Sequence, residues 1–442
     1  MTSTPLTRRA IFAQAWPIML GQTTVPLVGL VDTAVIGRTG DAAALAGVAL
    51  GTVVINMIFW TFGFLRMGMT GMTAQAEGAG DAREVEAMLL RGVVAGVGLG
   101  VLLFALQIVL IPLALETMAG GGALDDAARG YVSARFLGAP ASLAIFAING
   151  WLFGRGRTRA ALALQIVMNL VNIALNLLFV WHFHMGARGV GLGTACAEWI
   201  SLAVGLAIVG RGVDWRRIIS PALFGDGALR RLFAVNVDIM VRTIALLSLF
   251  LWFTNAGARL GATALAANYV LMQFVSVSAF VLDGFAFTAE SRVGQAIGAG
   301  SRPAMVRAIR LTGEFSLLAG IGFALLFFAL GPALIAFFAS NPAVRAQAGA
   351  MLPFAAIIPA IGVPAWLLDG IFIGATRGKA LRNAAILATA LYIATDLLFR
   401  PFGESGIWWA FMASYLYRAV SLGAYLPGLL WTIEVAEPAN GP

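Results

Sequence analysis

The segment "QAEGAGD" at residues 75–81 returns as "QAIGAGS" at residues 295–301, which is 220 residues further along the chain. Two other segments recur in the same order and at nearly the same spacing: "FAQAWPIM" (12–19) as "FAVNVDIM" (233–240), and "GWLFGRGRTRA" (150–160) as "GIFIGATRGKA" (370–380). An ordered series of this kind is not expected by chance. It indicates that the chain contains two copies of one structural unit.

The composition indicates whether this duplicated unit lies in water or in a membrane. Of the 442 residues 60% are hydrophobic and 11% are charged, with a mean hydropathy of +0.89. Soluble domains carry about 25% charged residues. Apolar runs recur from end to end, each long enough to cross a hydrocarbon layer of about 30 Å. The sequence therefore predicts an all-α integral membrane protein.

We expect twelve transmembrane helices in two pseudo-symmetric lobes of six, with the lobes at residues 1–215 (spans 1–6) and 216–442 (spans 7–12). Because six is even, both repeats insert the same way up and are parallel repeats with a cavity between them. The expected spans are 11–37, 44–74, 87–115, 128–153, 160–181, 188–210, 231–257, 263–292, 305–333, 345–373, 380–399 and 405–432.

The basic residues predict the orientation in the membrane. All but one of the 29 are arginines, and they gather in every second loop, as in Arg155, Arg157 and Arg159 after the fourth span. Basic loops stay in the cytoplasm, so we expect a multi-pass protein of the inner (plasma) membrane with both termini cytoplasmic. This distribution also argues against nucleic-acid binding, although the net charge is +8.

Enzymatic chemistry has no support in the sequence. No P-loop and no nucleophile–base arrangement is found, and we expect no cofactor. The single cysteine, Cys196, excludes an intrachain disulfide, and the histidines at 182 and 184 are too few to close a metal site.

Asp32 is the first candidate functional residue, because it lies within the apolar first span. A carboxylate there costs about 2.5–3.5 kcal/mol and normally faces a cavity or a partner. Low-dielectric surroundings favour the protonated form, so Asp32 could bind and release a proton. The alternative is a tether between helices near the outer mouth. Pro26, six residues earlier, removes a backbone donor and either bends this span or forms a static kink.

The fifth span carries three amides. Asn172 and Asn176 are four residues apart and share a helix face, and Asn169 lies one turn earlier on nearly the same stripe. Amides on an apolar helix require partners. They either belong to a polar site or join helices by hydrogen bonds.

The second half contains candidates for a second polar site. Asp283 and Asp369 each precede a glycine inside an apolar run, while Asp238 and Arg242 have the spacing of a self-neutralising helical pair. Asp396 occupies the repeat position of Asn176, and we expect it near Arg400 at the outer interface.

Four further charged residues lie within spans. Arg66 and Glu290 lie towards the inner ends of spans 2 and 8, where they could form a gate or a pair between lobes, as could Arg418 and Glu198.

Four segments resemble one family of transporters. "PLVGLVDTAVIGRTGDAAALAGVALG" (26–51), "LRMGMTGMTAQAEGAGD" (65–81), "FVLDGFAFTAESRVGQAIGAG" (280–300) and "WLLDGIFIGATRG" (366–378) are similar to motifs of the multidrug and toxic compound extrusion (MATE) family. The set favours its DinF-like branch. The resemblance implies a twelve-helix, two-lobed antiporter that exports organic compounds against an ion gradient.

The resemblance also implies a site. In MATE transporters an Asp of the first span joins an Asn and an acidic residue of the fifth span and a Thr of the sixth. Here the matching residues are Asp32, Asn172, Asn176 and Thr194. Because Asn176 replaces the second carboxylate, the site carries less charge for a metal cation, and protons are favoured over sodium.

The resulting prediction is a proton-coupled exporter of amphipathic, often cationic compounds, monomeric in the lipid membrane. The alternatives are sodium coupling, export of organic acids, a flippase for lipid-linked sugars and a passive channel. The few intramembrane arginines disfavour the flippase. Asp283 and Asp369, which recur in the family motifs, are expected to line the cavity or to switch its conformation.

Overall fold

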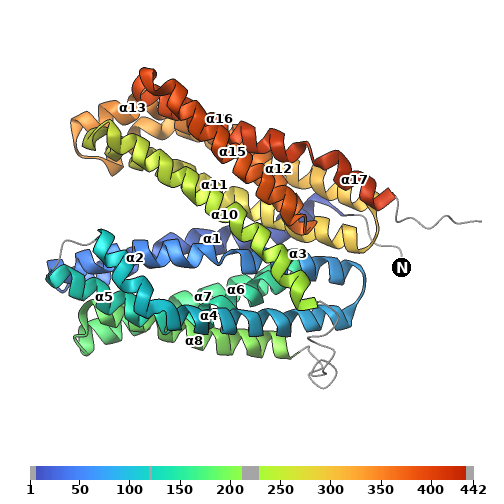
Figure 1. The fold of residues 1–442 in the computed structure, drawn as a ribbon, viewed down its shortest axis with the longest axis horizontal. Helices are drawn as coiled ribbons and strands as arrows, with labels where there is room; N and C mark the ends of the chain where they lie inside the picture. Colours follow the sequence, from blue (N-terminus) through green and yellow to red (C-terminus); the bar gives the residue numbers. More distant parts are fainter. Residues whose placement is uncertain (1–5, 119–121, 212–227, 435–442) are drawn as a thin grey trace, which may run out of the picture. The chain divides into compact units, whose positions relative to one another are not determined.

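The computed structural model describes residues 6–118, 122–211 and 228–434, and throughout them the regular secondary structure is helical (Figure 1). The N-terminal half contains α1 (Arg8–Gly37), α2 (Ala42–Thr61), α3 (Phe64–Gly78), α4 (Ala82–Met118), α5 (Ala123–Phe136), α6 (Ala139–Gly154), α7 (Thr158–Leu177), the π-helix η1 (Leu178–His182) and α8 (Gly186–Gly210). The C-terminal half contains α10 (Ala228–Arg259), α11 (Ala262–Gly298), α12 (Arg302–Phe338), α13 (Pro342–Ile361), α14 (Val363–Gly374), α15 (Gly378–Phe399), the 3₁₀-helix η3 (Arg400–Phe402), α16 (Gly403–Gly423) and α17 (Leu426–Glu434). The predicted all-α class is confirmed.

Each predicted span coincides with one helix or with two helices in series. Within the described residues, ten helical stretches are long and apolar enough to cross a membrane, and α5 with α6, which meet at 52°, form an eleventh. The last of the ten, Gly378–Trp431, has 54 residues and contains η3 near its middle. About 20 residues cross a bilayer. This stretch is therefore long enough for two spans, which agrees with the predicted twelve.

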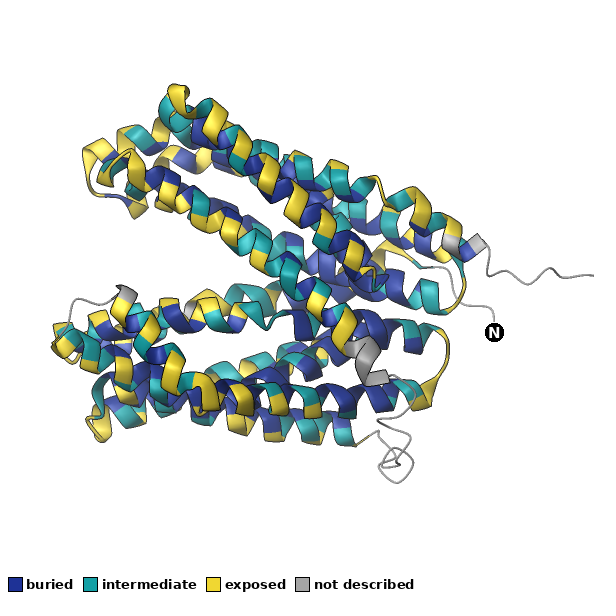
Figure 2. Ribbon diagram, in the orientation of Figure 1, coloured by how far each residue is buried: buried dark blue, intermediate teal, exposed yellow. Residues whose placement is uncertain are grey.

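Large apolar side chains lie on the outside of these helices. Ile108, Phe337 and Val420 are 79%, 82% and 73% exposed, and exposed positions follow the outer faces of the helices (Figure 2). Such an extended apolar surface is unfavourable in water, but it suits the hydrocarbon core of a bilayer. There the backbone N–H and C=O groups must find hydrogen-bond partners within the protein, and the helices supply them.

The helices pack into two compact units. The N-terminal unit comprises Leu20–Thr73 and Asp81–Phe233, and the C-terminal unit comprises Met1–Met19, Ala74–Gly80 and Ala234–Pro442. The predicted lobe boundary between residues 215 and 216 lies outside the described residues, so the division at that point stays a prediction.

The duplication in sequence corresponds to a duplicated helix contact. A Cβ atom on Gly150 of α6 would lie 2.4 Å from the carbonyl oxygen of Arg66 in α3. In the second half, a Cβ atom on Gly370 of α14 would lie 2.4 Å from the carbonyl oxygen of Ala286 in α11. Gly370 and Ala286 each follow their counterparts by 220 residues. The same close contact between two helices is therefore present in both repeats.

The two copies of the repeated motif also contact each other inside the C-terminal unit. A Cβ atom on Gly78 would lie 2.0 Å from the carbonyl oxygen of Gln295, and one on Gly298 would lie 1.9 Å from that of Gln75. The side chain of Gln75 donates hydrogen bonds to the Gly374 carbonyl at 3.0 Å and to the Thr376 hydroxyl at 3.1 Å. The glycines are required here because any larger residue would force the backbones apart.

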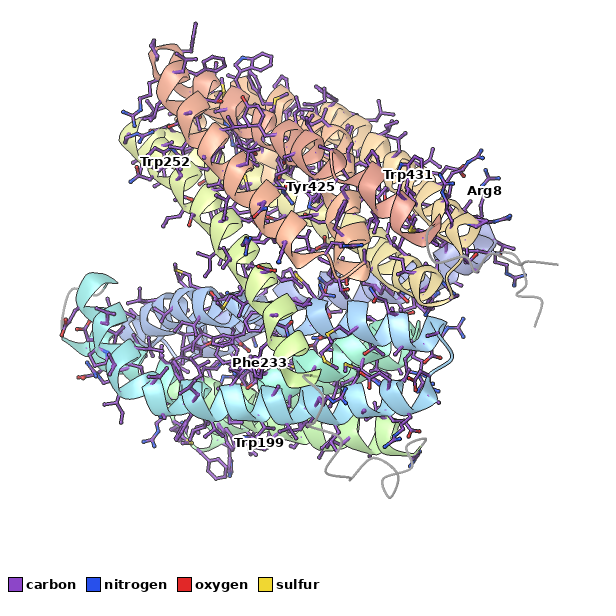
Figure 3. The ribbon with its side chains drawn as sticks, turned by 45° about the vertical axis from the view of Figure 1, so that its right-hand side comes forward. Arg8, Trp199, Phe233, Trp252, Tyr425 and Trp431 are labelled. Carbon is purple, nitrogen blue, oxygen red and sulfur yellow. The ribbon has the colours of Figure 1, made fainter. Side chains whose placement is uncertain are left out.

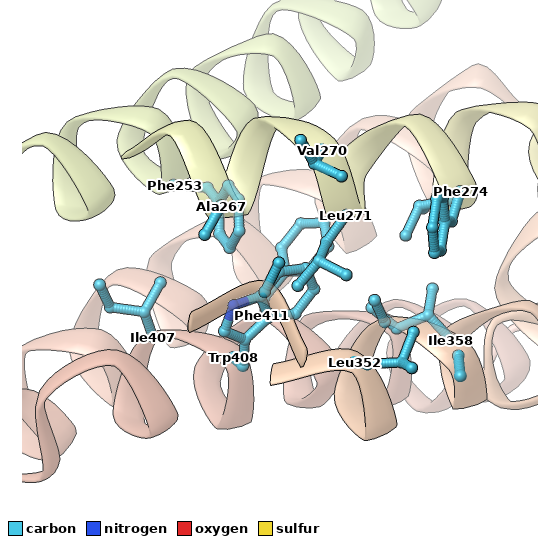
Figure 4. Packing of buried hydrophobic residues seen from close by; sticks show 14 of the residues in the cluster. Phe253, Ala267, Val270, Leu271, Phe274, Leu352, Ile358, Ile407, Trp408 and Phe411 are labelled. Carbon is cyan, nitrogen blue, oxygen red and sulfur yellow. The ribbon is translucent and has the colours of Figure 1, made fainter. Parts of the chain in front are cut away.

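Aromatic rings fill the core of the C-terminal unit (Figure 4). Phe253 of α10 meets Phe411 and Trp408 of α16, with ring centroids 4.5 Å and 5.2 Å apart. The buried indole nitrogen of Trp408 donates to the Asn268 side-chain oxygen at 2.8 Å. This core fixes α10, α11 and α16 relative to one another, and α10 and α16 also carry Arg242 and Arg418, which are considered below.

We expect Gly298→Ala to destabilise the protein by about 1–3 kcal/mol, since its new methyl group would meet backbone atoms that have no room to shift. The measurement is the apparent unfolding temperature of the purified protein in detergent, followed by tryptophan fluorescence. Gly322→Ala in α12 is the matched control, because no heavy atom lies within 4 Å of its Cβ position. An unfolding temperature for Gly298→Ala equal to that of the control would contradict the proposed close contact.

Candidate functional site

Asp32 lies in the second half of α1, a helix that continues without a break through Pro26, which is exposed. The carboxyl group of Asp32 is buried, with 8% of the residue exposed. Its Oδ1 atom accepts a hydrogen bond from Nδ2 of Asn176 at 2.6 Å. Among the described residues Asp32 makes no ion pair, so its direct partner is a neutral amide.

A chain of hydrogen bonds joins this carboxylate to the sixth span. Nδ2 of Asn172 donates to the hydroxyl of Thr194 at 2.8 Å, and that hydroxyl donates to the Val190 carbonyl at 3.0 Å. Nδ2 of Asn176 lies 3.4 Å from Oδ1 of Asn172. The structure therefore brings together the four residues that the sequence placed in one site.

Local sequence explains how α7 and α8 reach this arrangement. Asn172 and Asn176 are one turn apart on α7 and both are buried. Gly193 of α8 faces them, since a Cβ atom there would lie 2.0 Å from Oδ1 of Asn176. The third amide of the predicted stripe, Asn169, is only half buried and accepts from Gln165 at 2.9 Å. It therefore bonds along its own helix instead of to the cluster around Asp32.

A buried ion pair next to this site was not predicted. Nη1 of Arg135 in α5 lies 3.0 Å from Oε2 of Glu198 in α8, and both side chains are less than a tenth exposed. Arg135 also interacts electrostatically with Asp32. The sequence contained a signal, namely an arginine inside an apolar span and a glutamate one turn after Thr194, but it could not pair them.

In the C-terminal unit the predicted pair between Asp238 and Arg242 is wrong. Oδ1 of Asp238 accepts from Arg382 of α15 at 2.6 Å, while Arg242 binds Asp369 of α14. Arg418 of α16 binds the same oxygen of Asp369 at 2.5 Å. Both residues of α10 face neighbouring helices, so interhelical partners replace the local one. Arg418 and Glu198, named as candidates for a gate, thus belong to separate pairs, with Asp369 and Arg135.

Asp396, which the sequence placed near Arg400, is buried and has partners on α10. Its Oδ2 atom accepts from the indole of Trp252 at 2.9 Å and from Arg259 at 3.0 Å (Trp252 is labelled in Figure 3). Trp252 follows Asp32 by 220 residues, and Asp396 follows Asn176 by the same number. Both repeats therefore link their first and fifth spans at the same point, α1 with α7 and α10 with α15. The two links differ in which helix supplies the carboxylate.

Three further predicted residues have known positions but untested roles. Glu290 of α11 is buried, Asp283 of α11 is half buried, and the guanidinium carbon of Arg66 lies 5.8 Å from the ring centre of Phe153. Arg66 belongs to the N-terminal unit and Glu290 to the C-terminal unit. A gate formed by Arg66 and Glu290 stays a prediction, as does the role of Asp283.

These features define a class of protein: a membrane transporter built from two copies of a helical unit, with a buried polar cluster inside the first copy. The chain belongs to the MatE family. The family's model matches residues 17–178 and, a second time, residues 239–398, in agreement with the internal repeat.

Relatives in sequence support this assignment. The chain is 37% identical over 418 residues to DNA damage-inducible protein F of Escherichia coli, covering 94% of this chain and 91% of that protein. It is 31% identical over 318 residues to a probable multidrug resistance protein NorM of Deinococcus radiodurans, covering 70% and 68%. The predicted DinF-like branch is thereby confirmed, and the chain is a transporter and not an enzyme.

Solved structures share the fold. A MOP superfamily transporter from Pyrococcus furiosus, whose description reports a reverse polarity of its binding pocket, superposes with a TM-score of 0.87 at 16% identity, over 97% of this chain and 96% of the other. A MATE structure described as the bent conformation has a TM-score of 0.86 at 17% identity, over 96% and 95%. The predicted two-lobed fold is confirmed.

We expect Glu198→Gln to destabilise the protein by about 3–5 kcal/mol, because it leaves the buried Arg135 without a counter-charge. The double variant Arg135→Gln, Glu198→Gln should recover most of this loss. The measurement is the apparent unfolding temperature of the three proteins in detergent. If the double variant is less stable than Glu198→Gln, the ion pair is not the reason for the loss.

Proposed function

We propose that the protein exports amphipathic organic compounds in exchange for protons, and that Asp32 is the group that binds and releases the proton. The observation that supports this most directly is the identity of its partner. An amide offers both a donor and an acceptor, so it can bond to a carboxylate and to a protonated carboxyl group. A guanidinium only donates, and it therefore favours the charged form alone.

Three other acids within the helices fit this role less well. Asp369 is held by two arginines, Asp396 by Arg259 and Glu198 by Arg135. Protonating Asp369 or Glu198 would leave a buried guanidinium without its counter-charge, which is strongly unfavourable. Protonating Asp396 would break its ion pair with Arg259, whose side chain is 36% exposed. Protonating Asp32 leaves Arg135 paired with Glu198, so Asp32 is the one of these four acids that best fits reversible protonation.

The donor arrangement favours a proton over sodium. The amide nitrogens of Asn172 and Asn176 are directed at oxygens of the site, and the Thr194 hydroxyl donates to a backbone carbonyl. A hard cation needs several oxygens directed at one point. With one carboxylate and two amides turned to each other, the site is better suited to hydrogen bonds.

Coupling follows from competition for one site. A proton on Asp32 removes the negative charge that would attract a cationic substrate, so each ligand favours a different state of the N-terminal unit. Pro26 lacks a backbone donor, which lowers the cost of bending α1 next to Asp32. Relatives of this fold are described in a bent and in a straight conformation.

The proposal places the chain in the plasma membrane as a monomer, with both termini in the cytoplasm and small organic molecules as substrates. The distribution of basic residues supports the cytoplasmic location of both termini.

The test uses protein in liposomes loaded with ethidium, with a pH gradient or a sodium gradient imposed separately. We expect transport with the pH gradient alone and a loss of at least about tenfold, or 1.4 kcal/mol, in Asp32→Asn, which cannot exchange a proton.

The matched control is Asp396→Asn, which removes a buried acid in the other repeat. Transport driven by sodium alone would reverse the ion assignment and make Asn172, Asn176 and Thr194 sodium ligands. Transport that follows the substrate gradient and ignores both ions would favour a passive pore.

A further inference from the structure

Three helices of the C-terminal unit bring two arginines to one carboxylate. Arg242 comes from α10, Asp369 from α14 and Arg418 from α16, and both guanidinium groups donate to Oδ2 of Asp369. The side chains are 11%, 13% and 10% exposed, so the group is largely removed from solvent without being sealed. We call these three residues the Arg–Asp–Arg cluster.

The cluster contains more positive than negative charge. Two guanidinium groups share one carboxylate, and among the described residues neither arginine has another ion-pair partner. Two other acids of the C-terminal unit have arginine partners of their own, Asp238 with Arg382 at 2.6 Å and Asp396 with Arg259 at 3.0 Å. Buried charges are normally balanced. The excess positive charge is therefore a place where an anion would be stabilised.

The two guanidinium groups also have more N–H donors than hydrogen bonds. Each guanidinium has five N–H donors, but within the described residues each makes a single hydrogen bond, to Asp369. Nε of Arg242 is buried without a hydrogen-bond partner in that part of the chain. The N–H groups of a planar guanidinium could bind both oxygens of a second carboxylate through two parallel hydrogen bonds.

Aromatic rings adjoin the charged groups. Trp366 lies three residues before Asp369 on α14, and Tyr415 three residues before Arg418 on α16, with ring centroids 5.1 Å apart. The guanidinium carbon of Arg418 lies 5.8 Å from the Tyr415 ring centre. A cationic group edged by aromatic rings suits a ligand that combines a carboxylate with an apolar, aromatic body.

We propose that the Arg–Asp–Arg cluster binds the carboxylate of an amphipathic organic anion, and that Asp369 is a built-in competitor that occupies the arginines when the anion is absent. This gives the C-terminal unit a substrate class of its own. It rests on the proposed function only in assuming that the protein is an exporter.

A purely structural cluster would behave differently. If Asp369 serves only to tie α10, α14 and α16 together, its neutralisation would loosen the unit and weaken whatever binds there. If Asp369 competes with a ligand, its neutralisation frees two guanidinium groups and strengthens anion binding. The two accounts predict opposite signs for the same substitution.

The experiment measures equilibrium binding of radiolabelled salicylate, an aromatic carboxylate, to the purified full-length protein in detergent. We expect saturable binding that benzoate displaces and neutral salicylamide does not. Arg242→Gln and Arg418→Gln should weaken the affinity by about tenfold or more, and Asp369→Asn should strengthen it by about tenfold. Asp396→Asn, which alters the neighbouring one-to-one pair, should bind like the unchanged protein.

Any of three results would overturn the proposal: no saturable binding, equal displacement by salicylamide, or weaker binding in Asp369→Asn. Size-exclusion chromatography identifies variants that do not fold. If Arg418→Gln is among them, Arg418→Lys, which keeps the charge and loses the fork, should bind more weakly than the unchanged protein. Proton-driven efflux of ethidium, measured after the same proteins are reconstituted into liposomes, separates failure of this site from failure of the proton-coupled transport.

Discussion

The hydrogen bond from Asn176 to Asp32 is the contact on which the N-terminal site depends. A carboxylate inside a membrane span is stable only with a partner, and the choice of partner determines whether it can change its charge. The amide nitrogen donates to the carboxyl group at 2.6 Å, and the amide oxygen can accept from the protonated form. Gly193 permits this contact, since a side chain there would occupy the space of the Asn176 amide.

The second repeat keeps the same connection between helices but changes its chemistry. In both repeats the linked residues are 144 positions apart, Asp32 with Asn176 and Trp252 with Asp396. In the first repeat the acid lies on the first span, whereas in the second repeat it lies on the fifth span, where Arg259 pairs with it. In the C-terminal unit two arginines also bind Asp369, while the carboxylate of the N-terminal link has a neutral amide as its direct partner. The corresponding links of the two repeats thus differ in charge.

The sequence was sufficient for the features that depend on period and spacing. Apolar runs located the spans, the ordered repeat located the duplication, and the four-residue spacing of Asn172 and Asn176 placed them on one face. Pairings between distant helices were not accessible in this way. Asp238 and Arg242 have the spacing of a helical pair, yet each binds another helix because tertiary contacts offered better geometry. Arg135 was missed for the same reason, since nothing local in the sequence indicates Glu198 as its partner.

The most direct test of the central claim is to count protons released when a substrate binds. Purified protein in weakly buffered solution receives tetraphenylphosphonium, a lipophilic cation, and a pH-sensitive dye reports the protons released. The account predicts release of about one proton per cation bound, because the cation and the proton compete for Asp32. In Asp32→Asn the cation should bind without any proton release. Equal release from the variant and the unchanged protein would contradict the account and show that another group carries the proton.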